Sequence, residues 1–415
     1  MNGVRSMENE GKINGENQRR KRGDNMSESV EPFKLAVADE TLTELSSRLA
    51  NTRWPERETV SDWSQGVPLD RIKDLCDYWA RDYDWRRCEA RLNALGQYRT
   101  RIDGLRIHFL HIRSSNPDAR PILLTHGWPG SVVEFLDVIG PLTDPGAHGG
   151  DGADAFHLVI PSLPGFGFSD KPSSTGWGVE RIAAAWITLM KRLGYQRYFA
   201  QGGDWGAAVT TAIGMVAAPE CAGVHLNMPL IYPVRDDFAQ LTQAEQASVA
   251  SMKFYRDSDS GYAKQQHTRP QTLSYGLSDS PAGLAAWIYE KFYAWTDNCG
   301  EPESALSRDA ILDNIMLYWL PGTAASSARL YWESLDFFRT QRIAVPVGVT
   351  IFPKEFSRPS RRWAERNFAN IVHWNEADKG GHFAAFEQPE LFVTELRNCF
   401  RKMRLETQFC LPQLV

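Results

Sequence analysis

The chain has 415 residues, of which 42% are hydrophobic and 23% charged, so its composition is that of a folded protein whose length allows more than one domain. A net charge of −5 gives no support to nucleic-acid binding. No apolar run approaches the ~18 residues that span a bilayer, and no segment at the start resembles a signal peptide, so we expect a soluble, cytoplasmic protein. The cysteines lie far apart, contain no CxxC pair and predict neither a disulfide framework nor a zinc site: Cys76, Cys88, Cys221, Cys299, Cys399 and Cys410.

Residues 1–31 are almost free of large apolar side chains, which predicts a disordered leader despite the basic run at 19–22. Residues 32–115 form an N-terminal segment that is helical first and strand-like later. A helix is expected from Asp39, because the leucines that follow recur at a spacing of three to four, and a second helix from Leu69 to Tyr83. Alternation in Tyr98–Asp103 and Leu105–Ile112, with a break at Asp-Gly, predicts a β-hairpin.

Residues 116–228 alternate between short apolar runs and amphipathic segments. Strands are expected at Pro121–Thr125, Phe156–Ile160 and Arg197–Ala200, and helices at about Val132–Ile139, Val179–Leu193 and Ala207–Ala217. This alternation is typical of an α/β fold with a doubly wound, mostly parallel sheet.

Residues 229–335 are helical and rich in Tyr and Trp, and strand-like runs return only in residues 336–415. Those late elements are strands at Val345–Phe352 and Asn370–Trp374 and a helix at about Pro389–Met403. A helical block inserted before the last strands predicts a lid over the carboxyl edge of the sheet, where ligands of such sheets bind.

The segment Gly202-Gly203-Asp204-Trp205-Gly206 follows a predicted strand and precedes a helix. It matches the G-x-nucleophile-x-G elbow of the α/β-hydrolase fold, with Asp204 where an esterase has serine. The positive end of the helix favours the ionised carboxylate. An aspartate that merely caps the helix is the alternative interpretation.

A glycine-rich turn, Thr125-His126-Gly127-Trp128-Pro129-Gly130-Ser131, follows the first of these strands. Such a turn can direct backbone N–H groups into the site, so we expect the N–H groups of Trp128 and Trp205 to form an oxyanion hole. We also expect Trp128, Pro129 and Trp205 to contact the substrate. The alternative is a plain turn in which Ser131 caps the next helix.

In this fold the chain order is nucleophile, acid, histidine. His382 lies just after the last predicted strand, and no other histidine has that position. The orienting acid belongs after the preceding strand, which favours Glu355. Glu376 and Asp378 are closer to His382 in sequence, but they lie on the wrong loop.

A carboxylate nucleophile can displace at saturated carbon and form an ester on the enzyme. A histidine-activated water can then hydrolyse that ester, because its carbonyl can use the oxyanion hole. This points to epoxides or alkyl halides as substrates. Only an epoxide generates an alkoxide that needs a proton, and tyrosine is a suitable donor. Periodicity does not choose among the candidate tyrosines of the predicted lid, which are Tyr255, Tyr262, Tyr275, Tyr289, Tyr293, Tyr318 and Tyr331.

The strings HGWPGS, LPGFGFSDKP, QGGDWG and GGHFAAFEQPE are similar to those of the microsomal-type epoxide hydrolases, within the α/β-hydrolase superfamily. The lid and the stretch EPFKLAVADETLTELSSRLANTRWP are also similar, and the likeness covers about residues 32–403. The resemblance implies that Tyr262 and Tyr331 are the lid proton donors and that Glu355, aspartate in many fungal members, is the acid. Mammalian members have an N-terminal membrane anchor, which we do not carry over to this chain.

Together these patterns predict an epoxide hydrolase of xenobiotic-detoxifying type that makes vicinal diols with no cofactor and no metal. Its expected partners are a small epoxide and water, without nucleic acid or a membrane span, and a homodimer is among the assemblies that the sequence allows. A haloalkane dehalogenase and a non-catalytic binding protein of the same fold are the alternatives. The preferred epoxide, its enantiomer and the attacked carbon are left open.

Overall fold

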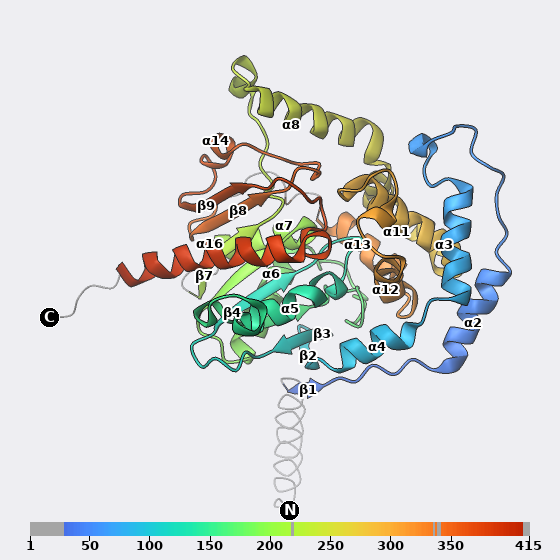
Figure 1. Ribbon diagram of the computed structural model, residues 1–415, viewed down its shortest axis with the longest axis horizontal. Helices are drawn as coiled ribbons and strands as arrows, with labels where there is room; N and C mark the ends of the chain where they lie inside the picture. Colours follow the sequence, from blue (N-terminus) through green and yellow to red (C-terminus); the bar gives the residue numbers. More distant parts are fainter. Residues whose placement is uncertain (1–28, 217–219, 335–336, 338–341, 410–415) are drawn as a thin grey trace, which may run out of the picture.

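The computed structural model describes residues 29–216, 220–334, 337 and 342–409 (Figure 1). A nine-stranded sheet forms its centre, in the order β1-β2-β3-β5-β4-β6-β7-β8-β9. The strands are β1 (Val30–Pro32), β2 (Gln97–Ile102), β3 (Leu105–Ile112), β4 (Arg120–Thr125), β5 (Phe156–Pro161), β6 (Tyr198–Gly202), β7 (Cys221–Leu226), β8 (Val347–Ile351) and β9 (Ile371–Glu376).

The antiparallel edge of the sheet contains β1, β2, β3 and β5. The predicted hairpin is confirmed, with Ile102 opposite Leu105. Its two-residue turn needs positive φ at both positions, and Asp103 and Gly104 have φ of 49° and 88°. Val30–Pro32 already pair with β2, so regular structure begins before residue 32. The basic run at 19–22 and Cys410 lie outside the described residues.

The rest of the sheet is parallel, from β5 through β4 to β9. Strand order reverses at β4, which lies between β5 and β6, and ligands bind at such a switch point. Sequence reasoning missed β7, because Gly223 and His225 interrupt its apolar run although all six of its residues are buried.

Helices cover both faces of the sheet (Figure 1). On one face α5 (Leu136–Thr143) contacts α16 (Pro389–Phe409), and on the other α6 (Val179–Arg192) contacts α7 (Asp204–Val216). The helix expected at 132–139 is α-helical only from Leu136 onward. A 3-10 turn at Val132–Phe135 precedes α5, and Ser131 caps that turn in a capping box with Glu134.

Helices alone follow β7, as expected of a lid: α8 (Gln243–Phe254), α9 (Gly261–Thr268), α10 (Pro270–Asp279), α11 (Pro281–Trp295), α12 (Arg308–Trp319) and α13 (Ala324–Glu333). The chain returns to the sheet through β8, α14 (Arg361–Ala364) and β9, and α15 (Ala384–Glu387) precedes α16.

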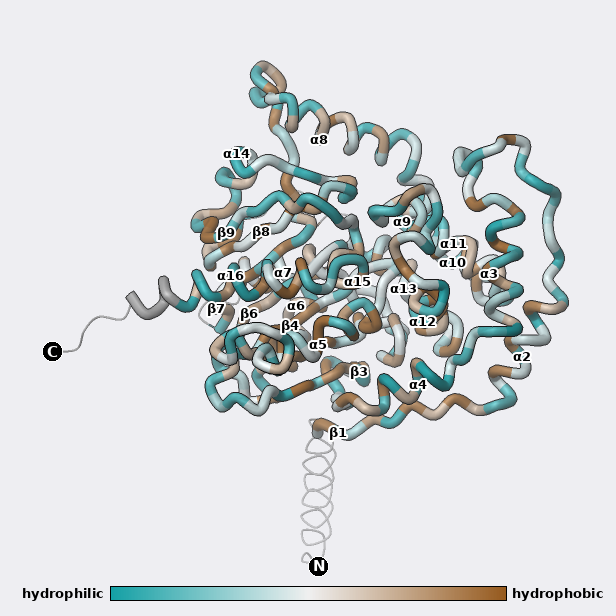
Figure 2. The backbone as a smooth tube through the Cα atoms, viewed as in Figure 1, coloured by the Kyte–Doolittle hydropathy of each residue, from teal (hydrophilic) through white to brown (hydrophobic). Residues whose placement is uncertain are grey.

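The N-terminal helices α2 (Asp39–Ala50), α3 (Leu69–Arg81) and α4 (Trp85–Asn93) pack against lid helices α11 and α12 (Figure 1). In Figure 2 hydrophilic and hydrophobic residues alternate along α3, as expected of a helix that buries one face. Asp313 of α12 accepts hydrogen bonds from the Tyr83 hydroxyl at 2.7 Å and from Arg87 at 2.9 Å. The N-terminal segment therefore fixes the lid over the sheet.

Candidate active site

Asp204 lies at a sharp bend between β6 and α7, and α7 begins at this residue. Its φ of 50° is unusual for a residue with a side chain, and such strain is concentrated at functional sites. A methyl group on Gly202 would overlap the Gly206 carbonyl, and one on Gly206 would overlap the Thr125 carbonyl. The elbow therefore requires glycine at both positions for space.

The turn after β4 (residues 125–131), which we call the oxyanion turn after its predicted role, lies against this elbow. The Trp128 backbone N–H donates to Asp204 Oδ1 at 2.7 Å, so one predicted donor of the oxyanion hole contacts the predicted nucleophile. Gly127 leaves room for the contact, because a Cβ there would overlap the Asp204 carboxylate. His126 holds the turn: its Nδ1–H donates to the Gly127 carbonyl and its Nε2 accepts from the Leu163 N–H.

Burial lowers the pKa of His126 to about 4, so this histidine stays neutral and acts as scaffold. Pro129 follows a cis peptide bond, and its carbonyl accepts a hydrogen bond from Asn314 at 2.7 Å. Pro129 is not among the residues that line the cavities beside Asp204, whereas Trp128 and Trp205 are. Its contact with substrate stays a prediction.

His382 lies between two carboxylates. Its Nδ1 is 2.9 Å from Glu355 Oε2 and 3.1 Å from Oε1, and its Nε2 is 3.5 Å from Asp204 Oδ2. Glu355 follows β8, as expected, and is buried, whereas Glu376 and Asp378 are exposed. Burial alone would lower the pKa of His382, but the charges of Glu355 and Asp204 outweigh it and raise that pKa well above 6.5.

Tyr262 of α9 and Tyr331 of α13 come together over Asp204, with ring centroids 5.8 Å apart. The Tyr262 ring stacks on Trp128 with ring centroids 4.9 Å apart, and the Tyr331 ring is nearly perpendicular to that of Trp205, with centroids 4.8 Å apart. Burial raises the pKa of both phenols well above 10, and neighbouring tyrosines and Asp204 raise it further. Both hydroxyls are therefore protonated donors at neutral pH.

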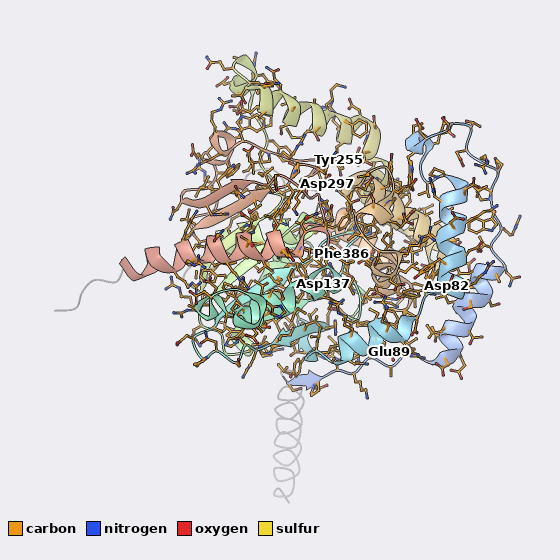
Figure 3. The ribbon with its side chains drawn as sticks, viewed as in Figure 1. Asp82, Glu89, Asp137, Tyr255, Asp297 and Phe386 are labelled. Carbon is orange, nitrogen blue, oxygen red and sulfur yellow. The ribbon has the colours of Figure 1, made fainter. Side chains whose placement is uncertain are left out.

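Sequence reasoning did not identify Tyr255. Its hydroxyl is 3.0 Å from that of Tyr262, and its ring stacks on Phe356 at 4.2 Å. Figure 3 labels Tyr255 near the end of α8, at the boundary between lid and core. Periodicity could not select it, because the contact depends on how the lid packs on the loop after β8.

A cavity of about 170 Å³ lies over Asp204, between core and lid. Its lining is mainly apolar and aromatic, as is usual for small-molecule sites: Asp204, Trp205, Met228, Leu230, Tyr232, Tyr255, Tyr262, Ala263, His267, Tyr331, Phe356 and Ser357. No group of three metal-binding side chains occurs within the described ranges.

A carboxylate at a strained elbow, a histidine–carboxylate pair and an oxyanion turn define a hydrolase of the α/β-hydrolase fold. Two family models match accordingly: the epoxide hydrolase N terminus over residues 30–135 and the alpha/beta hydrolase fold over residues 120–273. A Stigmatella aurantiaca protein assigned to the epoxide hydrolases is 58% identical, over 90% of this chain and 86% of its own.

Epoxide hydrolase 1 of Sus scrofa is 34% identical over 89% of this chain and 88% of its own. The crystal structure of juvenile hormone epoxide hydrolase from Bombyx mori superposes with a TM-score of 0.84 at 31% identity, covering 91% of this chain and 96% of that one. The chain belongs to the epoxide hydrolase family. This membership decides against the haloalkane dehalogenase and the binding protein that the sequence left open.

Over the part of the chain that the structure describes, no helix is both long enough and apolar enough to cross a bilayer.

Proposed function

We propose that the protein converts epoxides into vicinal diols through a covalent ester on Asp204. The observation that supports this proposal is the meeting of five groups at one point: the Asp204 carboxylate, the Trp128 N–H, His382 and the two phenols of the lid. They come from different parts of the chain, and each has the chemistry that one step requires.

In the first step Asp204 Oδ2 attacks an epoxide carbon and the C–O bond of the ring breaks. Tyr262 and Tyr331 hydrogen-bond the epoxide oxygen, and one of them gives its proton to the alkoxide. Because Asp204 loses its charge on forming the ester, the pKa of His382 falls. The proton that His382 releases restores the phenol by way of solvent.

In the second step His382 removes a proton from water, and the water oxygen attacks the Asp204 carbonyl carbon. The N–H groups of Trp128 and Trp205 stabilise the oxyanion, and Glu355 stabilises the imidazolium. When the tetrahedral intermediate breaks down, the alkyl oxygen leaves with a proton as the diol. The second proton of the water stays on His382, so one epoxide and one water yield one diol.

The test is a trap. His382→Gln retains the nucleophile and the phenols but removes the base, so mixing with styrene oxide should add one substrate mass, located on Asp204 by peptide mapping. Asp204→Asn is the matched control and should gain no mass. An unmodified Asp204 in the His382→Gln variant would contradict the proposal.

An isotope experiment checks the same route independently. In a single turnover of the wild-type enzyme in H₂¹⁸O, the label should enter the Asp204 carboxylate, because the diol receives the original aspartate oxygen. Label in the diol alone would mean that water attacks the epoxide directly.

A further inference from the structure

A second, smaller cavity lies behind Asp204, on the side of the oxyanion turn. We call it the rear chamber; its volume is about 20 Å³, and its lining includes Asp204, His382, Glu134, Gln201 and Thr125. A water molecule needs about 10–15 Å³ and two to four polar partners. The rear chamber therefore has room for one water beside both the ester carbon and the base.

Two walls of this chamber present polar atoms with unused bonding capacity. Gln201 Oε1 and Thr125 Oγ1 are buried and have no hydrogen-bond partner among the described residues. Gln201 Nε2 donates to Asn227 Oδ1 at 3.1 Å, which fixes the orientation of the amide. Because buried polar atoms are usually satisfied, these acceptors indicate a bound hydrogen donor in the chamber.

The third wall is Glu134, in the turn that follows the oxyanion turn. Its Oε1 accepts from the Ser131 N–H at 3.0 Å, and Gly130 leaves the space that this carboxyl group occupies. Glu134 forms no ion pair within the described part of the chain, and a half-buried carboxyl group beside Asp204 and without a cation favours its neutral form.

The electrostatics agree with this. Burial, together with the charges of Asp204 and Glu387, raises the pKa of Glu134 to about 8 against the opposing effects of His382 and the Ser131 N–H. Tyr318 of α12 also faces Glu134. At neutral pH the carboxyl group is therefore mostly protonated, with Oε1 as the acceptor for Ser131 and the hydroxyl as a donor.

We propose that Glu134 is a catalytic residue of the ester hydrolysis, which donates a hydrogen bond to the attacking water in the rear chamber. This inference rests on the proposed function. The water accepts from Glu134 and donates one O–H to His382 Nε2 and the other to Gln201 Oε1. Its remaining lone pair then points at the Asp204 carbonyl carbon. The Glu134 proton stays on Glu134, so the proton balance of the reaction is unchanged.

Variants that differ at this donor separate the two chemical steps. Glu134→Leu removes the donor, so single-turnover hydrolysis of the ester should slow by about 30-fold or more while alkylation stays within about threefold. Glu134→Gln keeps a donor, because its amide oxygen can accept from Ser131 and its NH₂ faces the chamber. Its hydrolysis rate should stay within about fivefold of wild type.

A purely structural role of Glu134 in the capping box makes a different prediction. Ser131→Ala removes the other half of that box and leaves the Glu134 carboxyl group in place, so it is the matched control. It should lower the unfolding temperature without accumulation of ester. If Ser131→Ala accumulates ester as Glu134→Leu does, or if Glu134→Leu slows both steps equally, the proposal is overturned.

The pH profile provides a test that does not require the leucine variant to fold. Ionisation of Glu134 removes the donor, so wild-type ester hydrolysis should fall as pH rises through about 8. In the ester Asp204 no longer raises that pKa, but neutral His382 no longer lowers it. The His382 effect is the larger of the two, so the fall moves to somewhat higher pH. Glu134→Gln cannot ionise and should lack the fall; an identical fall in this variant refutes the proposal. The His382→Gln trap tells the two failures apart, because a trapped ester upholds the proposed function even when Glu134 proves inert.

Discussion

Glu355→Gln tests how much the buried carboxylate contributes to catalysis. The replacement is close to isosteric, and its amide oxygen can still accept from His382 Nδ1. What is lost is the charge that the two contacts at 2.9 and 3.1 Å bring to the imidazole. The change therefore isolates electrostatic stabilisation from positioning.

The magnitude follows from the contact geometry. Hydrogen bonds to charged groups contribute about 1.5–3 kcal/mol, and this pair is shielded from water. Imidazolium forms in the hydrolytic step, so a loss of about 2–3 kcal/mol there slows hydrolysis roughly 30- to 150-fold. Alkylation needs no base and should change by less than about threefold.

Stopped-flow tryptophan fluorescence gives both rate constants, since Trp128 and Trp205 contact the phenols of the site. The Glu355 charge raises the pKa of His382, so its loss lowers that pKa and the base form appears at lower pH. The hydrolysis rate of the variant should therefore reach its plateau at lower pH than in wild type. Asp378→Asn, on the exposed loop nearer in sequence, is the control and should match wild type. Unchanged hydrolysis and an unmoved pH profile in Glu355→Gln would refute the reasoning.

Three further predictions concern the oxyanion turn, the lid and the lid's attachment. Gly127→Ala places a methyl group against the Asp204 carboxylate, so we expect soluble protein whose alkylation rate is at least ~100-fold lower; near-normal alkylation would contradict the clash. Tyr255→Phe removes the partner of the Tyr262 hydroxyl, and a hydrogen bond of about 1 kcal/mol predicts a roughly fivefold slower alkylation with unaltered hydrolysis. Glu245 of α8 is buried, which works against its charge, but hydrogen bonds to α14 and its own N-cap lower its pKa to about 2. Its stabilising effect is thus complete above pH 4.5 and lost as pH falls towards 2, so urea titrations of Glu245→Gln and wild type should differ at pH 7 and converge at pH 2.

The sequence was sufficient where a local pattern has only one structural solution. Asp-Gly between alternating runs predicts the hairpin, and glycines around Asp204 predict the elbow, because no larger residue fits at Gly202 or Gly206. The positions of the nucleophile, the acid and the histidine could also be predicted from the sequence. The ends of parallel strands meet at one edge of the sheet, so position relative to a strand predicts position in the site.

What the sequence could not determine depends on packing between distant segments. Tyr255 and Tyr262 are seven residues apart, but the place of Tyr255 beside the site depends on the stacking of its ring on Phe356, in the loop after β8. No sequence pattern singled out Glu134, and only the folded chain places its carboxyl group in the rear chamber with Gln201. Burial, pKa and the reach of a side chain are properties of the environment that the other elements build, so only the tertiary structure brought Tyr255 and Glu134 to the site.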